Sequence, residues 1–523
     1  MDFINKNIIF QKSLTTKNYD DLIGDIAKIS SHLRHFESVE IFLNSSYDFI
    51  ITLLGAINAG VKAFVLSKEG VSLDCKIAIN DSNICDFLGD VIESDSVIFD
   101  DSAYLDVPFF IQTSGSSKEY SDIIPKTLRA MILESNALAK TLQIKHSDIF
   151  IASPSHQHLF ALTFKLFLPL LNGGIILDAM FKFPELVIEF CQNHRDKNLV
   201  FITTPTLLKY LCEQKNLSSL RSVKYIISAG ARLDSAIRGI IKNVLDLDIF
   251  EVYGSTECGV IAFNVSDYFS AFDGVSLRLD GDSRLVIDSA WAFKKGFVSN
   301  DLAQIDGKKI YLKGRCDRII KIHDKRVSLD FLESQIKNLN IILDCYVGII
   351  NNRIHCIITL NDDGKRLFLD KGKKGILNAI KVLKIQEIRH FYIRESLPFN
   401  NQGKITKNNF IDSINAKILP RFEIIKSDEN SLCARGIVDC GSFIFDGHFP
   451  SFPLVAGFIE LDFVINLAKN YLNLGDIFEI ESVKFTSFLR PYDEVKIDIY
   501  RKNDKLYFHI FANEKECASG KIK

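Results

Sequence analysis

Strand-like and helix-like segments alternate along the first half of this chain, and the alternation limits the folds open to it. The apolar run 39–43 predicts a strand, residues 47–59 predict a helix that ends at Gly60, and 63–66 predict the next strand. Strands separated by helices are typical of parallel sheets, because a parallel connection must return along the whole length of the sheet. We therefore predict an α/β region over residues 36–263.

The middle of the chain has a different pattern. A chain of 523 residues is long enough for several domains, at roughly 100–200 residues each. Strand-like residues with Asp-Gly turns occupy 276–312, and a mixed α+β pattern follows over 317–416. The polar stretch 426–431 interrupts the hydrophobic rhythm. We therefore place a domain junction near it.

The C-terminal segment predicts one long helix and a set of antiparallel strands. An apolar helix is expected over 458–471. Val495, Ile497 and Ile499 then alternate with polar residues, and a turn at 503–504 leads into a returning strand. A long helix wrapped by an antiparallel sheet is the simplest architecture for this segment.

Charge and cysteine content exclude several classes of protein. Lysine and arginine number 63 against 65 acidic residues, which argues against a nucleic-acid partner. The 11 cysteines include no C-x-x-C pair, which favours reduced thiols over disulfides or zinc ligands. The apolar stretches 49–66 and 164–181 are interrupted, so neither predicts a membrane span, and the N-terminus lacks a signal-peptide pattern. We expect a cytoplasmic protein.

A polar loop rich in small residues follows an apolar run near residue 112. It contains Thr113, Ser114, Gly115, Ser116 and Ser117. Hydroxyl groups around a glycine let backbone N–H groups approach phosphate oxygens, so the loop is a candidate phosphate site. The alternative is an ordinary polar surface loop, because such loops are common.

Further short motifs follow in a fixed order. They are 228–233 (SAGARL), 253–257 (YGSTE), Asp301, 314–317 (GRCD), 397–398 (LP) and 403–405 (GKI). The Tyr-Gly-x-Thr-Glu string is the most specific of them. Together with the loop at 113–117 they resemble the adenylate-forming superfamily, which includes acyl-CoA synthetases and adenylation domains. The resemblance covers roughly residues 30–415.

This resemblance implies a large N-terminal domain, 1–316, and a small lid domain, 317–417, that turns about Asp317. It implies a carboxylic acid substrate, ATP and Mg²⁺, and CoA or the phosphopantetheine of a carrier protein as acceptor. The residues implied to contact ATP are Thr113, Ser114, Gly115, Ser116, Ser117, Gly230, Tyr253, Gly254, Thr256, Asp301 and Arg315. Glu257 is implied to hold Mg²⁺, and Lys404 to contact the carboxylate and the α-phosphate together. A lysine and a divalent cation offset the repulsion between those two anions.

The same resemblance suggests residues for the acyl pocket. His158 precedes an Ala-Leu step, where a histidine of this family often lies near the acyl group. The alternative is a core histidine that bonds a backbone carbonyl. Ser228, Ala229 and Cys258 are further candidates for the pocket.

The chain departs from the family pattern at several places. Residues 118–122 stand where a second glycine and a Pro-Lys pair are usual, so we expect Lys118 or Lys126 to cover the pyrophosphate instead. Asn300 replaces a glycine before the ribose-binding Asp301. Asp324 replaces a glycine between Lys321 and Arg326, which puts the thiol-bound lid geometry in doubt.

A second motif occurs in the C-terminal segment. Gly447-His448-Phe449-Pro450 leads through Ala456-Gly457 into the predicted helix, which carries Asp462. N–H groups at a helix start favour negative charge on an oxygen, and a histidine can take an α-proton from a thioester. A carboxyl group can then help a β-hydroxyl depart. The alternative is a capping histidine and a first-turn acid.

The full string resembles the hot-dog-fold 3-hydroxyacyl-ACP dehydratases, over about 421–523. The resemblance implies a third domain, 418–523, with His448, Gly457 and Asp462 at its site. It also implies a homodimer, because the histidine and the acid of this family meet across the dimer interface. Ala456 stands where proline normally precedes the glycine.

We therefore predict a bifunctional enzyme of the kind found in aryl-polyene-type gene clusters. Its first part adenylates a carboxylic acid and transfers it to a thiol, and its tail dehydrates a 3-hydroxyacyl thioester. Two alternatives stay open: a ligase whose tail only binds thioesters or dimerises, and a degenerate scaffold that docks carrier proteins.

Overall fold

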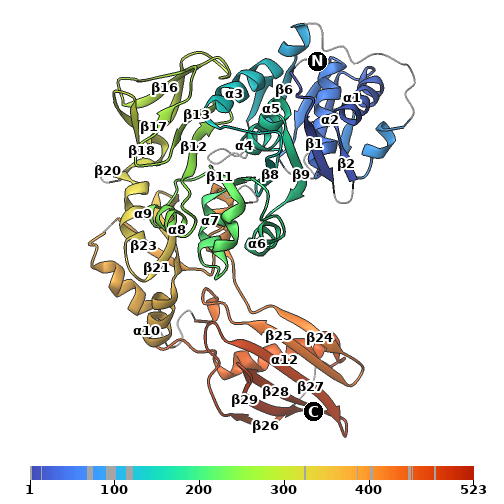
Figure 1. Cartoon of the computed structure of the whole chain (residues 1–523). Helices are drawn as coiled ribbons and strands as arrows, with labels where there is room; N and C mark the ends of the chain where they lie inside the picture. Colours follow the sequence, from blue (N-terminus) through green and yellow to red (C-terminus); the bar gives the residue numbers. More distant parts are fainter. Residues whose placement is uncertain are drawn as a thin grey trace. The chain divides into compact units, whose positions relative to one another are not determined.

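The computed structural model describes residues 3–12, 15–67, 73, 75–89, 102–113, 122–322, 325–385, 387–400, 404–445, 449, 451–475 and 479–523 (Figure 1). These residues form two compact units. The first contains Met1–Asp317 and Phe399–Thr406, and the second contains Arg318–Pro398 and Lys407–Lys523. In the described part of the chain, no helix combines the length and apolar character needed to cross a membrane.

The larger sheet of the first unit has the order β14-β13-β12-β11-β10-β8-β9-β1-β2. Its strands are β1 (Ile8–Lys12), β2 (Thr15–Lys17), β8 (Ile149–Ala152), β9 (Gly174–Met180), β10 (Leu199–Thr203), β11 (Val223–Ser228), β12 (Ile249–Ser255), β13 (Gly259–Asn264) and β14 (Ser270–Ala271). Every pair from β1 through β9, β8, β10 and β11 to β12 is parallel. The predicted α/β fold is confirmed.

The second sheet of this unit contains the β-α-β pattern found in the sequence. Its order is β5-β3-β4-β6-β7, with β5 (Ala78–Asn80), β3 (Ser38–Phe42), β4 (Lys62–Val65), β6 (Pro108–Gln112) and β7 (Ile123–Thr127). Helix α2 (Ser46–Asn58) connects β3 to the parallel β4. Ser45 caps its start by accepting from the Asp48 N–H at 3.1 Å, and Gly60 follows its end with φ +74°. Every residue of α2 is buried, which explains its apolar sequence.

Helices cover both sheets, and α1 and α2 pack against each other (Figure 1). The α-helices besides α2 are α1 (Tyr19–Leu33), α3 (Leu128–Thr141), α4 (Leu159–Ala161), α5 (Leu168–Asn172), α6 (Pro184–Asn193), α7 (Pro205–Cys212) and α8 (Ser235–Leu245). The π-helical turn η3 (Leu162–Phe167) joins α4 to α5. The 3₁₀ segments of this part are η1 (Ile84–Phe87), η2 (Ser102–Asp106), η4 (Leu217–Ser222) and η5 (Cys316–Arg318).

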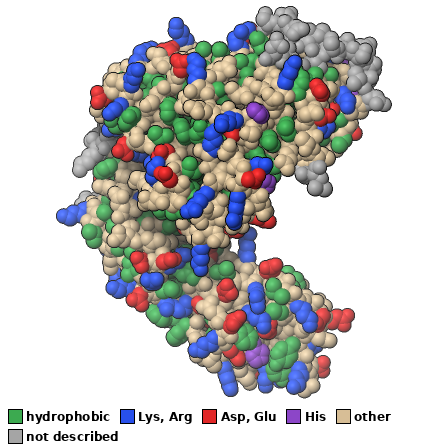
Figure 2. Space-filling view, viewed as in Figure 1, with side chains coloured by type: hydrophobic (Ala, Val, Ile, Leu, Met, Phe, Trp, Pro, Cys, Tyr) green, Lys and Arg blue, Asp and Glu red, His purple; other side chains and the backbone are tan. Residues whose placement is uncertain are grey.

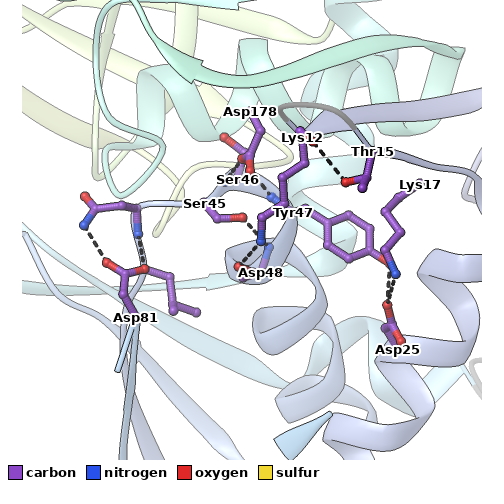
Figure 3. Close-up of polar contacts among 12 residues, drawn as sticks. Lys12, Thr15, Lys17, Asp25, Ser45, Ser46, Tyr47, Asp48, Asp81 and Asp178 are labelled. Atoms are coloured by element: carbon purple, nitrogen blue, oxygen red, sulfur yellow. Dashed lines mark hydrogen bonds and ion pairs between the residues drawn. The ribbon is translucent and has the colours of Figure 1, made fainter. Parts of the chain in front are cut away.

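A carboxylate from β9 holds the N-terminus of α2 (Figure 3). Asp178 accepts hydrogen bonds from the backbone N–H groups of Ser46 and Tyr47, the latter at 3.3 Å. N–H groups at a helix start lack partners within the helix and favour a negative charge there. Lys165 Nζ donates to Ser46 Oγ at 2.7 Å, and that oxygen lies 3.2 Å from His156 Nδ1. This buried network ties α2 and its sheet to the sheet that contains β9.

An antiparallel sheet completes the first unit. Its order is β15-β16-β17-β18, with β15 (Val275–Leu279), β16 (Arg284–Ser289), β17 (Phe297–Asp306) and β18 (Lys309–Arg315). It occupies the region in which the sequence predicted strands and Asp-Gly turns. Leu285 and Ile287 on β16 pack on Cys258 and Ile261, so this sheet lies against the β12–β13 hairpin.

The second unit begins with a mixed α+β segment. Its elements are β19 (Ile319–Ile322), β20 (Lys325–Ser328), α9 (Leu329–Lys337), β21 (Ile342–Ile350), β22 (Arg353–Leu360), α10 (Asp362–Lys381), β23 (Ile388–Ile393) and α11 (Lys407–Asn415). Strands β21 and β22 are antiparallel, whereas β22 and β23 are parallel. The hydrophobic side of this sheet packs on α9 and α10.

The tail is an antiparallel sheet that packs on one long helix (Figure 1). The sheet order is β24-β25-β27-β28-β29-β26, with β24 (Phe422–Ser427), β25 (Ser431–Ile437), β26 (Ile480–Phe485), β27 (Glu494–Lys502), β28 (Lys505–Ala512) and β29 (Lys515–Ile522). The helix is α12 (Gly457–Tyr471), and a short 3₁₀ segment, η6 (Phe443–Phe445), precedes it. The predicted hot-dog architecture is confirmed.

Arg394 joins the tail to the α+β segment within the second unit. Its side chain, 9% exposed, donates to the Ser413 carbonyl at 3.0 and 2.8 Å and to the Gly441 carbonyl at 3.3 Å. Cys440 packs into the hydrophobic cluster of β21, β22 and β23. Residues of the tail that follow β25 therefore belong to the same compact body as this segment.

Candidate active sites

The predicted metal residue Glu257 lies in the tight turn between β12 and β13. Gly254 opens this hairpin, and a Cβ there would lie 2.5 Å from the Gly259 carbonyl oxygen. Only glycine fits so close a strand crossing. The Cys258 N–H donates to Ser255 Oγ at 3.3 Å, which closes the turn around Thr256 and Glu257. Local sequence thus explains why this segment turns sharply here.

A buried lysine supports the backbone of the same turn. Lys126 on β7 is 3% exposed, and its Nζ donates to the carbonyl oxygens of Glu257 and Trp291, both at 3.4 Å. The Glu257 carbonyl also accepts from the Phe293 N–H at 2.7 Å. Lys126 is thus engaged with the turn, and cover of the pyrophosphate by Lys118 or Lys126 stays a prediction. Lys118 lies outside the described residues.

Glu134 on α3 is the buried acid that faces Lys126. Burial lowers the pKa of Lys126, and the Glu134 charge opposes that change. Burial likewise raises the pKa of Glu134, against the Lys126 charge. Glu134 Oε1 accepts from the Val260 N–H at 2.5 Å, and its Oε2 accepts from Thr163 Oγ1 at 3.2 Å. The sequence did not predict that Lys126 and Glu134 face each other. The one sequence signal was Pro125-Lys126, a Pro-Lys pair that comes later in the chain than is usual in the family.

The predicted ribose residues lie together at the end of two paired strands. Asp301 on β17 is the register partner of Arg315 on β18, and Arg315 Nη1 lies 3.6 Å from Asp301 Oδ1. Tyr253 donates its hydroxyl hydrogen to Asp301 Oδ2 at 2.6 Å. Burial first, and then the Asp301 charge, raises the pKa of Tyr253, so the phenol keeps its proton. Arg315 also forms a two-point contact with Asp317, at 2.9 and 2.7 Å.

The end of β11 offers an open, polar position beside the turn. Gly230 has φ +101°, and no atom lies within 4 Å of where its Cβ would be. The buried Ser228 Oγ has no hydrogen-bond partner among the described residues. Ala229 is buried next to it, and Cys258 is fully buried in an apolar cluster. Burial raises the pKa of the Cys258 thiol to about 12, which keeps it protonated.

Lys404 lies within electrostatic reach of three other predicted residues. Its segment, Phe399–Thr406, groups with the first unit. Desolvation lowers the pKa of Lys404, the Glu257 charge raises it, and the Arg315 charge lowers it. The pKa of His158 is lowered to about 4, by burial first and then by the Lys404 charge. The structure therefore brings together a lysine, a glutamate, an arginine and a neutral histidine.

The predicted phosphate loop falls mostly outside the described residues. Ser114, Gly115, Ser116 and Ser117 all belong to the part that is not described. At its two ends, the Thr113 N–H donates to the Asp122 carbonyl at 2.8 Å, and the Asp122 N–H donates to Thr113 Oγ1 at 3.1 Å. These two bonds join the residues that flank the predicted loop.

The C-terminal motif is described only in part. Gly457 is the first residue of α12, and a Cβ there would lie 2.6 Å from the Phe485 ring. Asp462 lies on the exposed side of the helix. His448, the other predicted catalytic group, lies outside the described residues.

Exposed phenylalanine side chains occur within this motif, on α12 and near the end of β26. They are Phe449, Phe452, Phe458, Phe485 and Phe488, and we call them the phenylalanine patch. Exposed apolar patches of this kind mark interaction surfaces.

Aromatic rings also line the outward face of β27 and β28. Tyr500 stacks on both Tyr507 and His509, and His509 stacks on Phe511. Figure 2 shows hydrophobic side chains and a histidine gathered over these strands. A hollow of about 470 Å³ lies beside them, with Lys426 and Asp498 on its wall.

Comparison with known proteins assigns families to two stretches of the chain. Residues 126–283 match the model of the AMP-binding enzyme family. Residues 424–521 match the model of the ApeI-like family, which is described as ApeI dehydratase. No curated protein sequence matches the chain.

Solved structures share the fold of the first part at low sequence identity. ATP-bound MatB from Rhodopseudomonas palustris has a TM-score of 0.68 at 15% identity, over 78% of this chain and 96% of that one. O-succinylbenzoate coenzyme A synthetase from Bacillus subtilis, in complex with AMP, has a TM-score of 0.63 at 14% identity, over 77% of this chain and 95% of that one. A benzoate CoA ligase from Burkholderia xenovorans has a TM-score of 0.63 at 14% identity, over 77% of this chain and 96% of that one. The chain therefore carries an AMP-binding enzyme domain and an ApeI-like dehydratase domain, and its first part has the fold of the adenylate-forming acyl-CoA ligases.

Proposed function

We propose that this protein is a bifunctional acyl-activating enzyme. Its first part would convert a carboxylic acid and ATP to an acyl-adenylate and pyrophosphate, and then pass the acyl group to a thiol. Its tail would remove water from a 3-hydroxyacyl thioester. The observation that carries the ligase half is the position of Lys404, whose charge acts on His158 and is acted on by Glu257 and Arg315.

The residues around Glu257 fit ATP and Mg²⁺. The open space at Gly230 offers room for a base, and Asp301 offers a carboxylate for ribose hydroxyls. Glu257 supplies the oxygen ligand that Mg²⁺ prefers. When bound, the ion would neutralise phosphate charge as the carboxylate attacks.

Lys404 would bring the two anionic reactants together. An ammonium group between a carboxylate and an α-phosphate lowers their repulsion. The long lysine side chain lets this group contact an oxygen of each reactant. The neutral His158 beside it adds no second positive charge at that point, since burial lowers its pKa to about 4. We assign His158 to the wall of the acyl pocket.

The acceptor would be the thiol of CoA or of a carrier-protein phosphopantetheine. The solved structures that share the fold include a named coenzyme A synthetase and a named CoA ligase. The ApeI-like tail supports a carrier protein instead, because the dehydratases that it resembles act on acyl groups held by carriers. We expect the lid to turn about Asp317 between the two half-reactions.

In the tail, His448 would take the α-proton and Asp462 would assist the departing hydroxyl. Because Asp462 faces outward, it would meet the histidine of a second copy, which makes the homodimer the active form. The phenylalanine patch supports this arrangement, since a dimer would cover it.

ATP–pyrophosphate exchange with a panel of carboxylic acids tests the ligase half. We expect acid-dependent exchange that falls about 100–1,000-fold in Lys404→Ala, as for loss of one preorganised charge contact. Lys407→Ala, an exposed lysine three positions on, is the matched control and should keep full exchange. ATP binding by calorimetry without exchange for any acid would favour the docking scaffold instead.

Hydration of crotonyl or decenoyl thioesters tests the dehydratase half in reverse. We expect His448→Ala to lose at least about 100-fold in rate, since general-base catalysis contributes on that order. Asp462→Asn should show a comparable loss. A wild-type protein that binds these thioesters but hydrates none would leave the tail as a binding or dimerising module.

A further inference from the structure

Helix α12 buries a carboxylic acid at the head of its core-facing stripe. Glu460 precedes Phe463, Val464 and Leu467 at helical spacing, and all of these side chains are buried. Glu460 itself is 2% exposed. Glutamate is almost never fully buried unless it is paired, so this position calls for a reason.

The Glu460 carboxyl lacks the compensation that buried acids usually have. Within the described part of the chain, its Oε2 has no hydrogen-bond partner and no cation forms an ion pair with it. The titratable group that senses its charge is the buried thiol of Cys517 on β29. That thiol donates to the Ile510 carbonyl at 3.3 Å, so its hydrogen is already used.

Two effects compete for the charge of this carboxyl. Its place in the first turn of α12 favours the ionised form, because the helix dipole is positive there. Burial favours the neutral form, and it is the larger effect: the pKa of Glu460 is raised to about 7. Near neutral pH this group therefore both holds a proton and can release it.

Glu460 also lies at the part of the tail that the sequence motif marks. It is one helical turn after Gly457, where the Phe485 ring takes the space that a side chain would fill. Asp462, two residues later, faces the opposite, exposed way. The head of α12 thus carries one carboxyl directed to the outside and one to the interior.

We propose that Glu460 is an additional catalytic acid of the tail, which protonates the hydroxyl group that leaves a 3-hydroxyacyl thioester. This inference rests on the proposed dehydratase function. The base of that reaction removes the α-proton, and the C–H electron pair becomes the Cα=Cβ double bond. The Cβ–O bond breaks, and the oxygen takes the Glu460 proton and departs as water, while Asp462 of the second copy orients the departing hydroxyl by a hydrogen bond. The proton left on the base then returns to the Glu460 carboxylate before the next turnover.

A purely structural glutamate would behave differently. An unpaired carboxyl in a hydrophobic core destabilises the fold, so an apolar side chain of similar size should stabilise it. Residues kept at a cost to stability are typical of active sites. The Glu460→Met substitution therefore separates the two roles, since we expect a higher melting temperature together with a loss of activity.

The test uses the full-length protein and hydration of a crotonyl N-acetylcysteamine thioester. We expect kcat to fall about 100-fold in Glu460→Gln with KM nearly unchanged, because the amide keeps the shape but cannot take the proton from the water that adds to Cβ. Glu494→Gln, on the exposed side of β27, is the matched control and should keep the parental rate. A Glu460→Gln variant as fast as the wild type would overturn the proposal.

The pH profile gives a second readout. We expect the dehydration rate of the wild type to fall above a pH of about 7, as Glu460 loses its proton. This alkaline limb of the pH–rate profile should be absent in Glu460→Gln. Cys517→Ala should retain the limb, which excludes the thiol that faces the acid as its origin. A limb that persists unchanged in Glu460→Gln counts against the proposal.

Failure of the dehydratase function is distinguishable from failure of this inference. If the wild type neither hydrates nor dehydrates any thioester, the dehydratase function fails. The infrared C=O band of the Glu460 acid, identified by its loss in Glu460→Gln, then tests the contact itself. A shift of that band on adding a 3-hydroxydecanoyl thioester supports the contact, and an unmoved band overturns it.

Discussion

His156 is a buried histidine that its neighbours keep neutral. Its Nε2 lies 2.9 Å from the Leu43 carbonyl oxygen, so that nitrogen carries the hydrogen. Its Nδ1 then accepts from Ser46 Oγ, which in turn accepts from Lys165. The pKa of His156 is lowered to about 3, by burial first and then by the Lys165 charge. A second positive charge in this network would have no partner.

We predict that this histidine makes the first unit sensitive to acid. The unfolded chain has a histidine pKa near 6.5, whereas the folded value is about 3. Between these values the unfolded state binds a proton that the folded state does not, so stability falls as the pH falls below about 6.5. At pH 5 the loss is about 2 kcal/mol relative to pH 7.

Urea unfolding at pH 7 and pH 5, followed by the fluorescence of Trp291, measures this effect. Trp291 is the one tryptophan of the chain and lies in the first unit, so it reports that unit. In His156→Gln we expect the loss between the two pH values to be smaller by about 2 kcal/mol. His509→Gln, in the tail, is the control. Equal pH dependence in His156→Gln and the wild type would contradict the assignment.

At the scale of elements, the β12–β13 hairpin positions the predicted ATP and metal residues. Tyr253 and Gly254 end its first strand, Glu257 lies in its turn, and Lys126 reaches the turn from β7. The hairpin therefore links the sheet that carries β12 to the strand that follows the predicted phosphate loop. Small changes in the hairpin backbone would move several predicted ligand contacts together.

We predict that Gly254→Ala disturbs this hairpin. The new Cβ would lie 2.5 Å from the Gly259 carbonyl oxygen, so the backbone must shift, at a cost of about 1–3 kcal/mol. ATP–pyrophosphate exchange should fall at least about 10-fold, a change of roughly 1.4 kcal/mol in the barrier. Gly239→Ala on α8 has open space around its Cβ and serves as the control. Full exchange in Gly254→Ala would show that the turn tolerates the shift.

At the scale of the whole molecule, the chain crosses repeatedly between its two units. It leaves the first unit after Asp317, returns for Phe399–Thr406, and leaves again at Lys407. The returning segment carries Lys404, the lysine on which the proposed ligase half depends. The α+β segment and the tail share the second unit, joined through Arg394 and Cys440.

We predict that the full-length protein is a dimer held by its tail. Phe458 is 60% exposed in the first turn of α12 beside the predicted motif. Phe458→Ser should lower the mass measured by light scattering to that of one chain and abolish thioester hydration. ATP–pyrophosphate exchange should persist, because the residues predicted to bind ATP lie in the first unit.

Phe331→Ser is the matched control for the dimer. Phe331 is 59% exposed, but it lies on α9, away from the tail sequence. We expect this variant to keep the mass of the wild type. A wild-type protein that is a single chain at all concentrations would contradict the dimer.

The sequence by itself determined the elements and the family resemblances. Strands predicted at 39–43 and 63–66 lie at 38–42 and 62–65, and the helix predicted at 458–471 is α12. These features depend on local hydrophobic periodicity and on turn residues, both of which are visible in the sequence. The motif order was likewise local, and matches to the AMP-binding and ApeI-like family models confirm the adenylate-forming and dehydratase resemblances that it predicted.

Only the tertiary structure decided which polar groups are buried and which face each other. His156 and His158 are two residues apart, yet the first bonds Leu43 and the second senses Lys404. Lys126 supports Glu257, 131 positions away, and Glu460 turns inward where the motif had drawn attention to Asp462. Burial and charge depend on residues brought from distant parts of the chain, whereas the period of a helix or strand depends on its nearest neighbours alone.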